Sequence, residues 1–174
     1  MILNNQTINL RAIEVSDLEL IQRWRNMQSI QPFVREYREM SFINVENWYN
    51  SIVNNREFIF FIIEDQKKLP IGVAGLTYID WLNKHADLHL GLYEKSWGDE
   101  SYGKATVNMM LNHGFNFLNL NKIYAEIYSI DDAKLKLFSN SNFKQDAILR
   151  EHYYFKGKYR DSHIFSILKS EFKL

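Results

Sequence analysis

The chain has 174 residues, of which 46% are hydrophobic and 24% are charged, a composition typical of globular proteins and not of disordered ones. Its 21 Lys and Arg residues balance 21 Asp and Glu residues, and this zero net charge argues against nucleic acid as a partner. Cysteine is absent, which excludes a disulfide scaffold, a Cys-ligated metal and a cysteine nucleophile.

We expect neither a secretory signal nor a membrane-spanning segment in this sequence. Met1–Thr7 is polar, and the longest apolar runs, such as Phe58–Ile63, are far shorter than the ~20 residues that cross a bilayer. We therefore expect a cytoplasmic protein with no membrane partner. Only 7 Gly and 2 Pro are present and neither type is clustered, so a single domain over residues 1–174 is predicted.

The N-terminal half contains patterns of both strands and helices. Alternation over Ile8–Ile13 predicts a strand, and Ser16–Glu19 has the form of a capping box that opens a helix. A second helix is predicted over Asn44–Val53. The aromatic and β-branched run Phe58–Glu64 and the following run Ile71–Ile79 predict two strands that form a hairpin.

The C-terminal half predicts a strand–helix–strand crossover with parallel strands, followed by a helix and two strands, which makes the chain mixed α/β. Strands are predicted over Ala86–Tyr93, Lys122–Tyr128, Lys144–Phe155 and Tyr159–Leu168, and helices from Gly103 to Leu118 and from Asp131 to about Asn140.

The most informative segment is Glu100–Thr106, at the predicted start of the third helix. The small residues Gly103 and Ala105 let a ligand approach the backbone, and a helix start offers unpaired N–H groups. Together with the helix dipole, this predicts a phosphate or pyrophosphate site. The segment matches neither a Walker A loop nor a Rossmann fingerprint, and a plain helix N-terminus remains the alternative.

Three motifs, in this order, make the chain resemble the GCN5-related N-acetyltransferase (GNAT) superfamily over its full length. The first is the pyrophosphate loop, matched at Gly103 and Ala105 but with Glu100 where Gln or Arg is usual. The second runs from Asp131 to Phe143, with Asp in place of the usual Asn at its start. The third is the tail from Leu149 to Asp161, which is similar to the ribosomal-protein acetyltransferase branch.

The resemblance implies a GNAT-like fold: a twisted mixed sheet of about seven strands flanked by about four helices, in which the strands Ala86–Tyr93 and Lys122–Tyr128 splay apart. Acetyl-CoA would lie in that gap as the acetyl donor, and no metal is expected. The cofactor contacts that the resemblance implies are main-chain groups of Leu90, Gly91 and Leu92, the segment Glu100, Ser101, Tyr102, Gly103, Lys104, Ala105 and Thr106, and the side chain of Asp131.

Amine acylation requires a general base, because an alkyl ammonium with a pKa of about 10 must lose a proton before it can attack. We expect this base to be His89, then Asp87, then Glu126, since each lies on a strand that borders the gap. Each could equally be a residue of a solvent-facing strand surface. Where the family has a tyrosine acid this chain has Phe138, so either Tyr153 protonates the leaving thiolate or the thiolate leaves without help.

The acceptor is expected to be a small-molecule amine, bound by the segment that holds Arg35, Tyr37 and Arg38. Two arginines and an aromatic ring suit an amino-sugar nucleotide of surface polysaccharide synthesis. The alternative for this segment is a solvated loop in which the arginines pair with Glu36 and Glu39. A ribosomal-protein N-terminus and a polyamine are the competing acceptors.

Without cysteine, the acetyl group is expected to pass directly from donor to acceptor in a ternary complex. Two other classes stay open: a non-catalytic module that binds acyl-CoA, and a pure protein-interaction domain. A free sheet edge near the C-terminus would also permit a homodimer.

Overall fold

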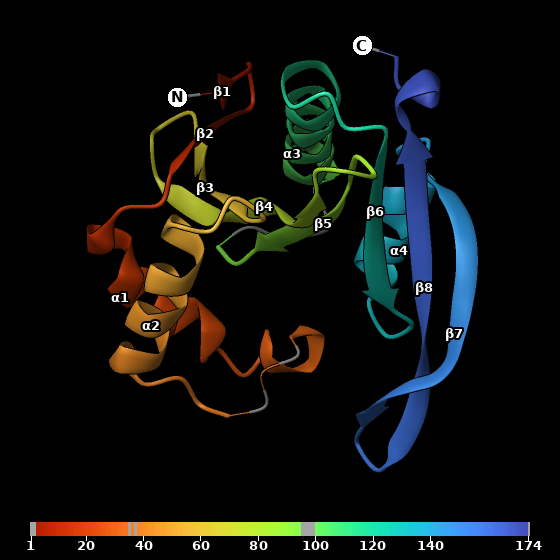
Figure 1. Ribbon diagram of the computed structural model, residues 1–174. Helices are drawn as coiled ribbons and strands as arrows, with labels where there is room; N and C mark the ends of the chain where they lie inside the picture. The colour runs from red at the N-terminus through yellow and green to blue at the C-terminus, as the bar shows by residue number, and fades with distance from the viewer. Residues whose placement is uncertain (1–2, 35, 37, 95–99, 174) are drawn as a thin grey trace.

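The computed structural model describes residues 3–34, 36, 38–94 and 100–173. Within these ranges the chain forms one eight-stranded sheet in the order β1-β2-β3-β4-β5-β6-β8-β7 (Figure 1). The strands are β1 (Leu3–Asn4), β2 (Ile8–Ala12), β3 (Ile59–Asp65), β4 (Pro70–Asp80), β5 (His85–Leu92), β6 (Lys122–Tyr128), β7 (Lys144–Phe155) and β8 (Lys158–Leu168). The mixed α/β GNAT-like fold expected from the sequence is confirmed, with one short additional strand, β1.

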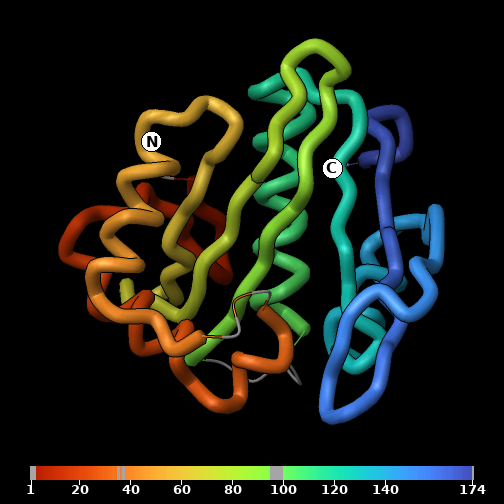
Figure 2. The backbone as a smooth tube through the Cα atoms, turned by 60° about the horizontal axis from the view of Figure 1, so that its bottom comes forward, coloured from red at the N-terminus to blue at the C-terminus, as the bar shows by residue number. Residues whose placement is uncertain are grey.

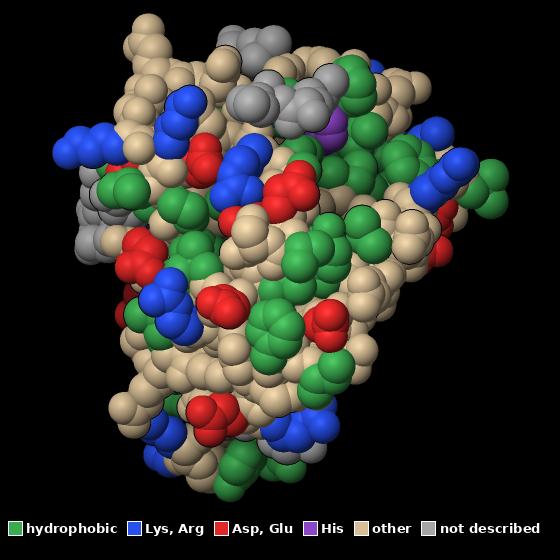
Figure 3. Space-filling view, turned by 90° about the vertical axis from the view of Figure 1, so that its left-hand side faces the viewer, with side chains coloured by type: hydrophobic (Ala, Val, Ile, Leu, Met, Phe, Trp, Pro, Cys, Tyr) green, Lys and Arg blue, Asp and Glu red, His purple; other side chains and the backbone are tan. Residues whose placement is uncertain are grey.

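Among the described residues, four α-helices flank the sheet: α1 (Leu18–Arg25), α2 (Phe42–Val53), α3 (Glu100–Asn112) and α4 (Asp132–Ser139). Short 3₁₀ turns cover Val15–Asp17, Gln31–Phe33 and Lys169–Glu171, and a π-helical turn, His113–Phe117, continues α3. None of the described helices is long and apolar enough to cross a membrane. On the face formed by α1 and α2, Lys and Arg side chains are interspersed with Asp and Glu (Figure 3).

The helices cover opposite faces of the sheet, and neighbouring strand residues point to different cores. On β3, Ile62 packs with α1 and α2, whereas Phe61 and Ile63 pack in the larger core with α3 and α4. This follows from the two-residue period of a strand, and both faces are apolar because both are covered.

Strands β5 and β6 form the parallel pair of the sheet and separate soon after they meet. Their pairing covers only His85–Asp87 against Lys122–Tyr124, whereas β4 pairs with β5 as far as Leu92. Figure 2 shows the two strands diverging beyond this short contact. The predicted splay is therefore confirmed, and the edge of β5 that faces β6 lacks a strand partner beyond Asp87 among the described residues.

Two predicted helix starts are wrong. Ser16 and Glu19 do not form the predicted capping box. The box is formed by Glu14 and Asp17, and the Asp17 carboxylate accepts the Glu14 N–H at 2.8 Å, so the N-cap lies two residues before Ser16. The third helix already includes Glu100 and does not open at Gly103. A Glu100–Lys104 ion pair of 2.7 Å spans its first turn, and an acidic group in that turn is favourable to the helix dipole.

Candidate functional site

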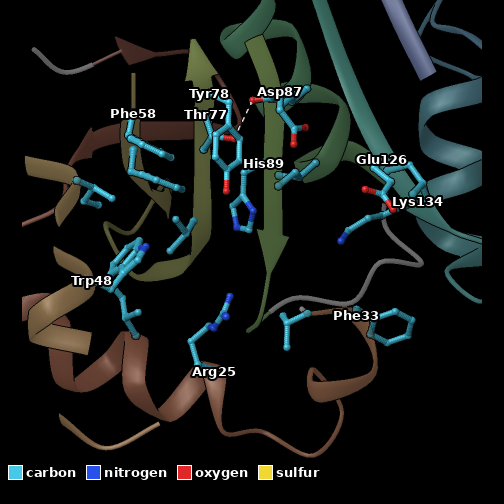
Figure 4. A pocket seen from close by; sticks show the side chains of 18 of the residues that line it. Arg25, Phe33, Trp48, Phe58, Thr77, Tyr78, Asp87, His89, Glu126 and Lys134 are labelled. Atoms are coloured by element: carbon cyan, nitrogen blue, oxygen red, sulfur yellow. Dashed lines mark hydrogen bonds between the residues drawn. The ribbon is translucent and has the colours of Figure 1, made fainter. Parts of the chain in front are cut away.

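A cavity of about 460 Å³ lies where β5 and β6 separate, and its walls come from α1, α2, β3, β4, β5, β6 and α4. Segments from both halves of the chain therefore meet around one space (Figure 4). Strand β5 forms its floor through Asp87, Leu88, His89 and Leu90, and β6 and α4 close one side. A gap between parallel strands with open backbone edges is a natural place for an extended ligand.

The side of the cavity near α2 is aromatic. Trp48 meets the edge of Phe60 with ring centroids 5.4 Å apart, and the ring of Phe58 stacks parallel to that of Phe60 at 6.5 Å. Tyr78 continues the row, with its ring 5.2 Å from that of Phe58. We refer to Trp48, Phe58, Phe60 and Tyr78 as the aromatic wall; all four residues line the cavity.

Two cations face the same space from different elements. Arg25, the last residue of α1, and Lys134 of α4 both line the cavity and point into it from separate sides (Figure 4). Their charges both act on His89, which lies between them on β5. Sequence reasoning missed both residues, because nothing in the local pattern shows that the end of α1 and the start of α4 border the same cavity.

All three predicted bases reach the cavity. Alternation along β5 places Asp87 and His89 on one face, and Glu126 projects from β6 across the gap (Figure 4). The Glu126 side chain is only 11% exposed, and its Oε1 lies 3.4 Å from Nε2 of His152 on β7. The structure thus brings two carboxylates and one imidazole together from two strands that are distant in the sequence.

His89 is uncharged in this setting. Burial, with the charges of Lys134 and Arg25, lowers the pKa of His89 to about 3. An imidazole with so low a pKa is a much weaker base than a free one. A carboxylate attracts an ammonium group as well as accepting its proton, so this geometry favours Glu126 and Asp87 over His89, which the sequence ranks first.

Of the stacked pair Tyr128 and Tyr153, Tyr128 lines the cavity and Tyr153 does not. The two rings stack with centroids 4.0 Å apart, and Tyr128 is the one that lines the cavity. The Tyr153 hydroxyl is buried and lacks a hydrogen-bond partner within the described part of the chain. Tyr128 shares a strand face with Glu126, and that alternation was the signal available in the sequence.

The position that the resemblance assigns to a proton donor carries none. Phe138 is buried, lines the cavity and packs edge-on against Phe143 with ring centroids 4.8 Å apart. Its ring closes the cavity below α4 and adds apolar surface. Phe138 therefore cannot protonate the leaving thiolate.

The predicted pyrophosphate segment forms the first two turns of α3. Gly103 allows α3 to approach α4, since a Cβ there would lie 2.9 Å from Cδ2 of Leu137. Thr106 is buried and donates its hydroxyl to the Tyr102 carbonyl at 2.8 Å. These residues set how closely the helix start sits against α4, and they do not line the cavity itself.

Glu100 departs from the family pattern, yet two lysines neutralise it. Its carboxylate binds Lys104 at 2.7 Å and Lys136 of α4 at 2.8 Å, and these hydrogen bonds lower the pKa of Glu100 to about 2. This cluster of one carboxylate and two ammonium groups carries one net positive charge. The residues present therefore fit a pyrophosphate despite the acidic side chain.

Asp131 acts as the N-cap of α4, as predicted. It is buried, lines the cavity, and accepts the Lys134 N–H at 3.1 Å, while its other oxygen lies 3.4 Å from Lys134 Nζ. The lysine partly offsets the carboxylate that faces the ligand space. A role for Asp131 toward the cofactor stays a prediction.

The predicted acceptor segment is described only in part. Arg35 and Tyr37 lie outside the described residues. Arg38 is exposed and pairs with Glu36, with Nη2–Oε2 at 2.9 Å, and it does not line the cavity. Its pairing with Glu36 agrees with the alternative of a solvated, internally paired loop, and a role for Arg38 in acceptor binding stays a prediction. No group of three or more potential metal ligands occurs among the described side chains.

Comparison with known proteins defines the class. A family model described as an acetyltransferase (GNAT) domain matches residues 10–164, and the chain belongs to this family. It is an acetyl-CoA-dependent N-acetyltransferase, as the sequence motifs and the splayed strands indicate.

Curated relatives are similar to this chain over nearly its whole length. The spermidine N(1)-acetyltransferase of Vibrio cholerae serotype O1 is 27% identical over 168 residues, covering 97% of this chain and 96% of the relative. An uncharacterized N-acetyltransferase, p20, of Bacillus licheniformis is 27% identical over 176 residues, covering 98% and 97%. The tail motif points to the ribosomal-protein branch, whereas the characterised relative acts on spermidine.

Solved structures of spermidine N-acetyltransferase also match this chain over nearly its whole length. The crystal structure of the Vibrio cholerae spermidine N-acetyltransferase with CoA and spermine matches with a TM-score of 0.89 at 27% identity, covering 96% of this chain and 98% of that one. A dodecameric structure of the enzyme matches with a TM-score of 0.83 at 26% identity, covering 95% and 96%.

Proposed function

We propose that this acetyltransferase transfers the acetyl group of acetyl-CoA to a primary amine of a polyamine such as spermidine. The observation that carries the proposal is the similarity, over nearly the whole chain, to a spermidine acetyltransferase whose structure holds CoA and spermine. We also propose that the chain self-associates, since a relative has been solved as a dodecamer.

The chemistry of the cavity supports a cationic acceptor. The carboxylates of Asp87 and Glu126 lie at its floor and side, where they attract an ammonium group. The aromatic wall offers π-faces over which the other ammonium groups of an extended polyamine can lie. Asp87 and Glu126 are therefore the proposed acceptor-binding and proton-accepting groups.

The reaction requires little more than alignment and loss of one proton. Bound acetyl-CoA supplies an activated acetyl group, and the unpaired edge of β5 at Leu90–Leu92 is proposed to hold its pantetheine arm. The acceptor ammonium gives one proton to a carboxylate, and the freed amine then forms the C–N bond as the C–S bond breaks. The second proton that the nitrogen loses goes to the CoA thiolate, directly or through water. Since the chain lacks cysteine, we propose direct transfer within a ternary complex.

An amino-sugar nucleotide is the second candidate, because Arg25 and Lys134 also face the cavity. A guanidinium suits a phosphate, and the aromatic wall suits a stacked base. Initial rates with spermidine, spermine, a nucleotide-linked amino sugar and a ribosomal-protein N-terminal peptide distinguish the acceptors. Turnover of spermidine or spermine above the others supports the proposal. Turnover of only the sugar nucleotide or only the peptide contradicts it.

Arg25→Gln sharpens this comparison. With an anionic acceptor, the KM for the acceptor should rise about 10-fold or more, because a charge-assisted contact is lost. With a polyamine, the KM should stay the same or fall, because a repelling cation is removed. Arg23→Gln is the matched control, since Arg23 lies exposed on the same helix and does not line the cavity.

A further inference from the structure

The C-terminal hairpin of β7 and β8 contains an irregularity beside the cavity. Leu149 pairs with Ser162 and Tyr153 with Arg160, so residues 150–152 of β7 face the single residue Asp161 of β8. Glu151 at the centre of this bulge has φ 51°, a left-handed conformation that non-glycine residues rarely adopt. Bulges of this kind re-aim side chains and are frequent beside functional sites.

Asp161 holds the bulge and ties it to the edge of the cavity. Its carboxylate accepts the Glu151 N–H at 2.8 Å, and its carbonyl accepts the Ser129 N–H at 3.0 Å. Ser129 follows β6 directly, so one residue connects the bulge to the strand that carries Glu126. One hydrogen bond of Asp161 thus holds Glu151 in its strained conformation, and the other holds Asp161 against the end of β6.

The bulge delivers His152 to Glu126. Nε2 of His152 lies 3.4 Å from Oε1 of Glu126, in a contact that joins β7 to β6 across β8. The two side chains differ in environment: Glu126 is 11% exposed and lines the cavity, whereas His152 is 47% exposed. The pair therefore spans the distance between the enclosed site and bulk water.

We propose that His152 is a positioning residue that orients Glu126 and carries its proton to solvent. The inference rests on the proposed function, because it assigns to Glu126 the proton that the acceptor amine must lose. Imidazole is the side chain that most readily takes up and releases protons near neutral pH, through two separate nitrogens. This suits a group with one nitrogen at the site and the rest of its ring in water.

The proton balance is simple. An N–H bond of the acceptor ammonium breaks as an O–H bond forms on Glu126. That O–H bond then breaks as Nε2 of His152 gains the proton, and the Nδ1 proton leaves to water. Exchange of the ring protons with water then returns His152 to the tautomer that carries its proton on Nδ1. Glu126 is restored as a carboxylate for the next turnover, and the neutral amine is left to attack the thioester.

The test compares His152→Ala and His152→Gln with the wild-type enzyme, using the best acceptor amine and saturating acetyl-CoA. His152→Gln retains a polar group near Glu126 but cannot carry a proton. For both variants we expect kcat to fall about 10-fold to 100-fold, the range of general acid–base contributions, while the acceptor KM and the acetyl-CoA Kd change less than about 2-fold. His163→Ala is the matched control. His163 lies on the neighbouring strand β8, bonds to Gln145, and does not line the cavity.

Added imidazole distinguishes proton transfer by His152 from a purely structural role, because free imidazole can carry a proton but cannot replace a packing contact. The half-exposed His152 side chain leaves a solvent-open space when truncated, so imidazole should restore part of the kcat of His152→Ala and none of that of His152→Gln. An unchanged kcat in His152→Ala, full activity in His152→Gln, absence of rescue, or loss of acetyl-CoA binding would each overturn the relay. If the wild-type enzyme turns over no amine, the proposed function fails. If the wild type and the His152 variants turn over the amine equally well, only the proposed role of His152 fails.

Discussion

Single side chains at this site serve the fold and the ligand space together, and Asp131 is the clearest case. Its carboxylate caps α4 through the Lys134 N–H and also faces the cavity. Capping needs only a side-chain oxygen, which Asn also provides. The negative charge, in contrast, opposes the binding of a phosphorylated donor. The two roles can therefore be separated by substitution.

We predict that Asp131→Asn leaves the free energy of unfolding within about 0.5 kcal/mol of the wild type and tightens acetyl-CoA binding several-fold. Asp131→Ala should lose about 1 kcal/mol because the cap is gone. Urea denaturation and calorimetric titration measure the two effects. Weaker binding by Asp131→Asn would show that the carboxylate makes a favourable contact with the cofactor.

His89 links the site to pH-dependent stability. Its pKa is about 3 in the folded protein, below the value of about 6.5 for an unfolded chain. Between these two values the unfolded state binds a proton at His89 and the folded state does not. The stability that is fully present above about pH 6.5 is therefore lost as the pH falls toward 3. We predict that His89→Gln shows a smaller drop in Tm than wild type between about pH 7 and about pH 5. An equal drop would mean that His89 titrates normally in the folded protein.

At the scale of elements, the contribution of an ion pair to the free energy of unfolding depends on how deeply its charges are buried. Arg11 of β2 binds both oxygens of Asp17 at 2.7 and 2.8 Å and reaches Glu64 of β3 at 2.6 Å. Asp17 itself is buried, so this cluster fixes the start of α1, a wall of the cavity, against two strands. The Lys122–Asp146 pair is equally short, at 2.6 Å, but both of its side chains are 38% exposed.

We predict that Arg11→Ala lowers the free energy of unfolding by about 2 kcal/mol or more, since it strands a buried carboxylate, whereas Lys122→Ala costs less than about 1 kcal/mol. Chemical denaturation of both variants tests the contrast. Equal losses would indicate that the partial exposure of Arg11 cancels the effect of burying Asp17.

At the scale of the whole molecule, the cavity is assembled from residues as distant as Ile21 and Phe138. A donor bound there contacts both halves of the sheet and favours the folded state over the unfolded one. At acetyl-CoA near 100 times its Kd, linkage predicts a gain of about 2.7 kcal/mol, or a Tm rise of roughly 5–10 °C for a domain of this size. Differential scanning fluorimetry measures this shift, and absence of a shift would contradict cofactor binding at the site.

The sequence alone determined much of the architecture, because local periodicity reports the environment of each strand. The alternation of β5 and β6 predicts both their buried faces and the exposure of Asp87, His89 and Glu126 to a common gap. The bounds of β6 and β7 and the cap at Asp131 follow from the same local rules.

Only the tertiary structure decided which of these groups work together. No local pattern places Arg25 opposite Lys134, lets two lysines neutralise Glu100, or brings His152 from β7 onto Glu126. The basicity of His89 likewise depends on burial and on charges that arrive from α1 and α4. The physical reason is that secondary structure depends on neighbours along the chain, whereas electrostatics and ligand shape depend on neighbours in space.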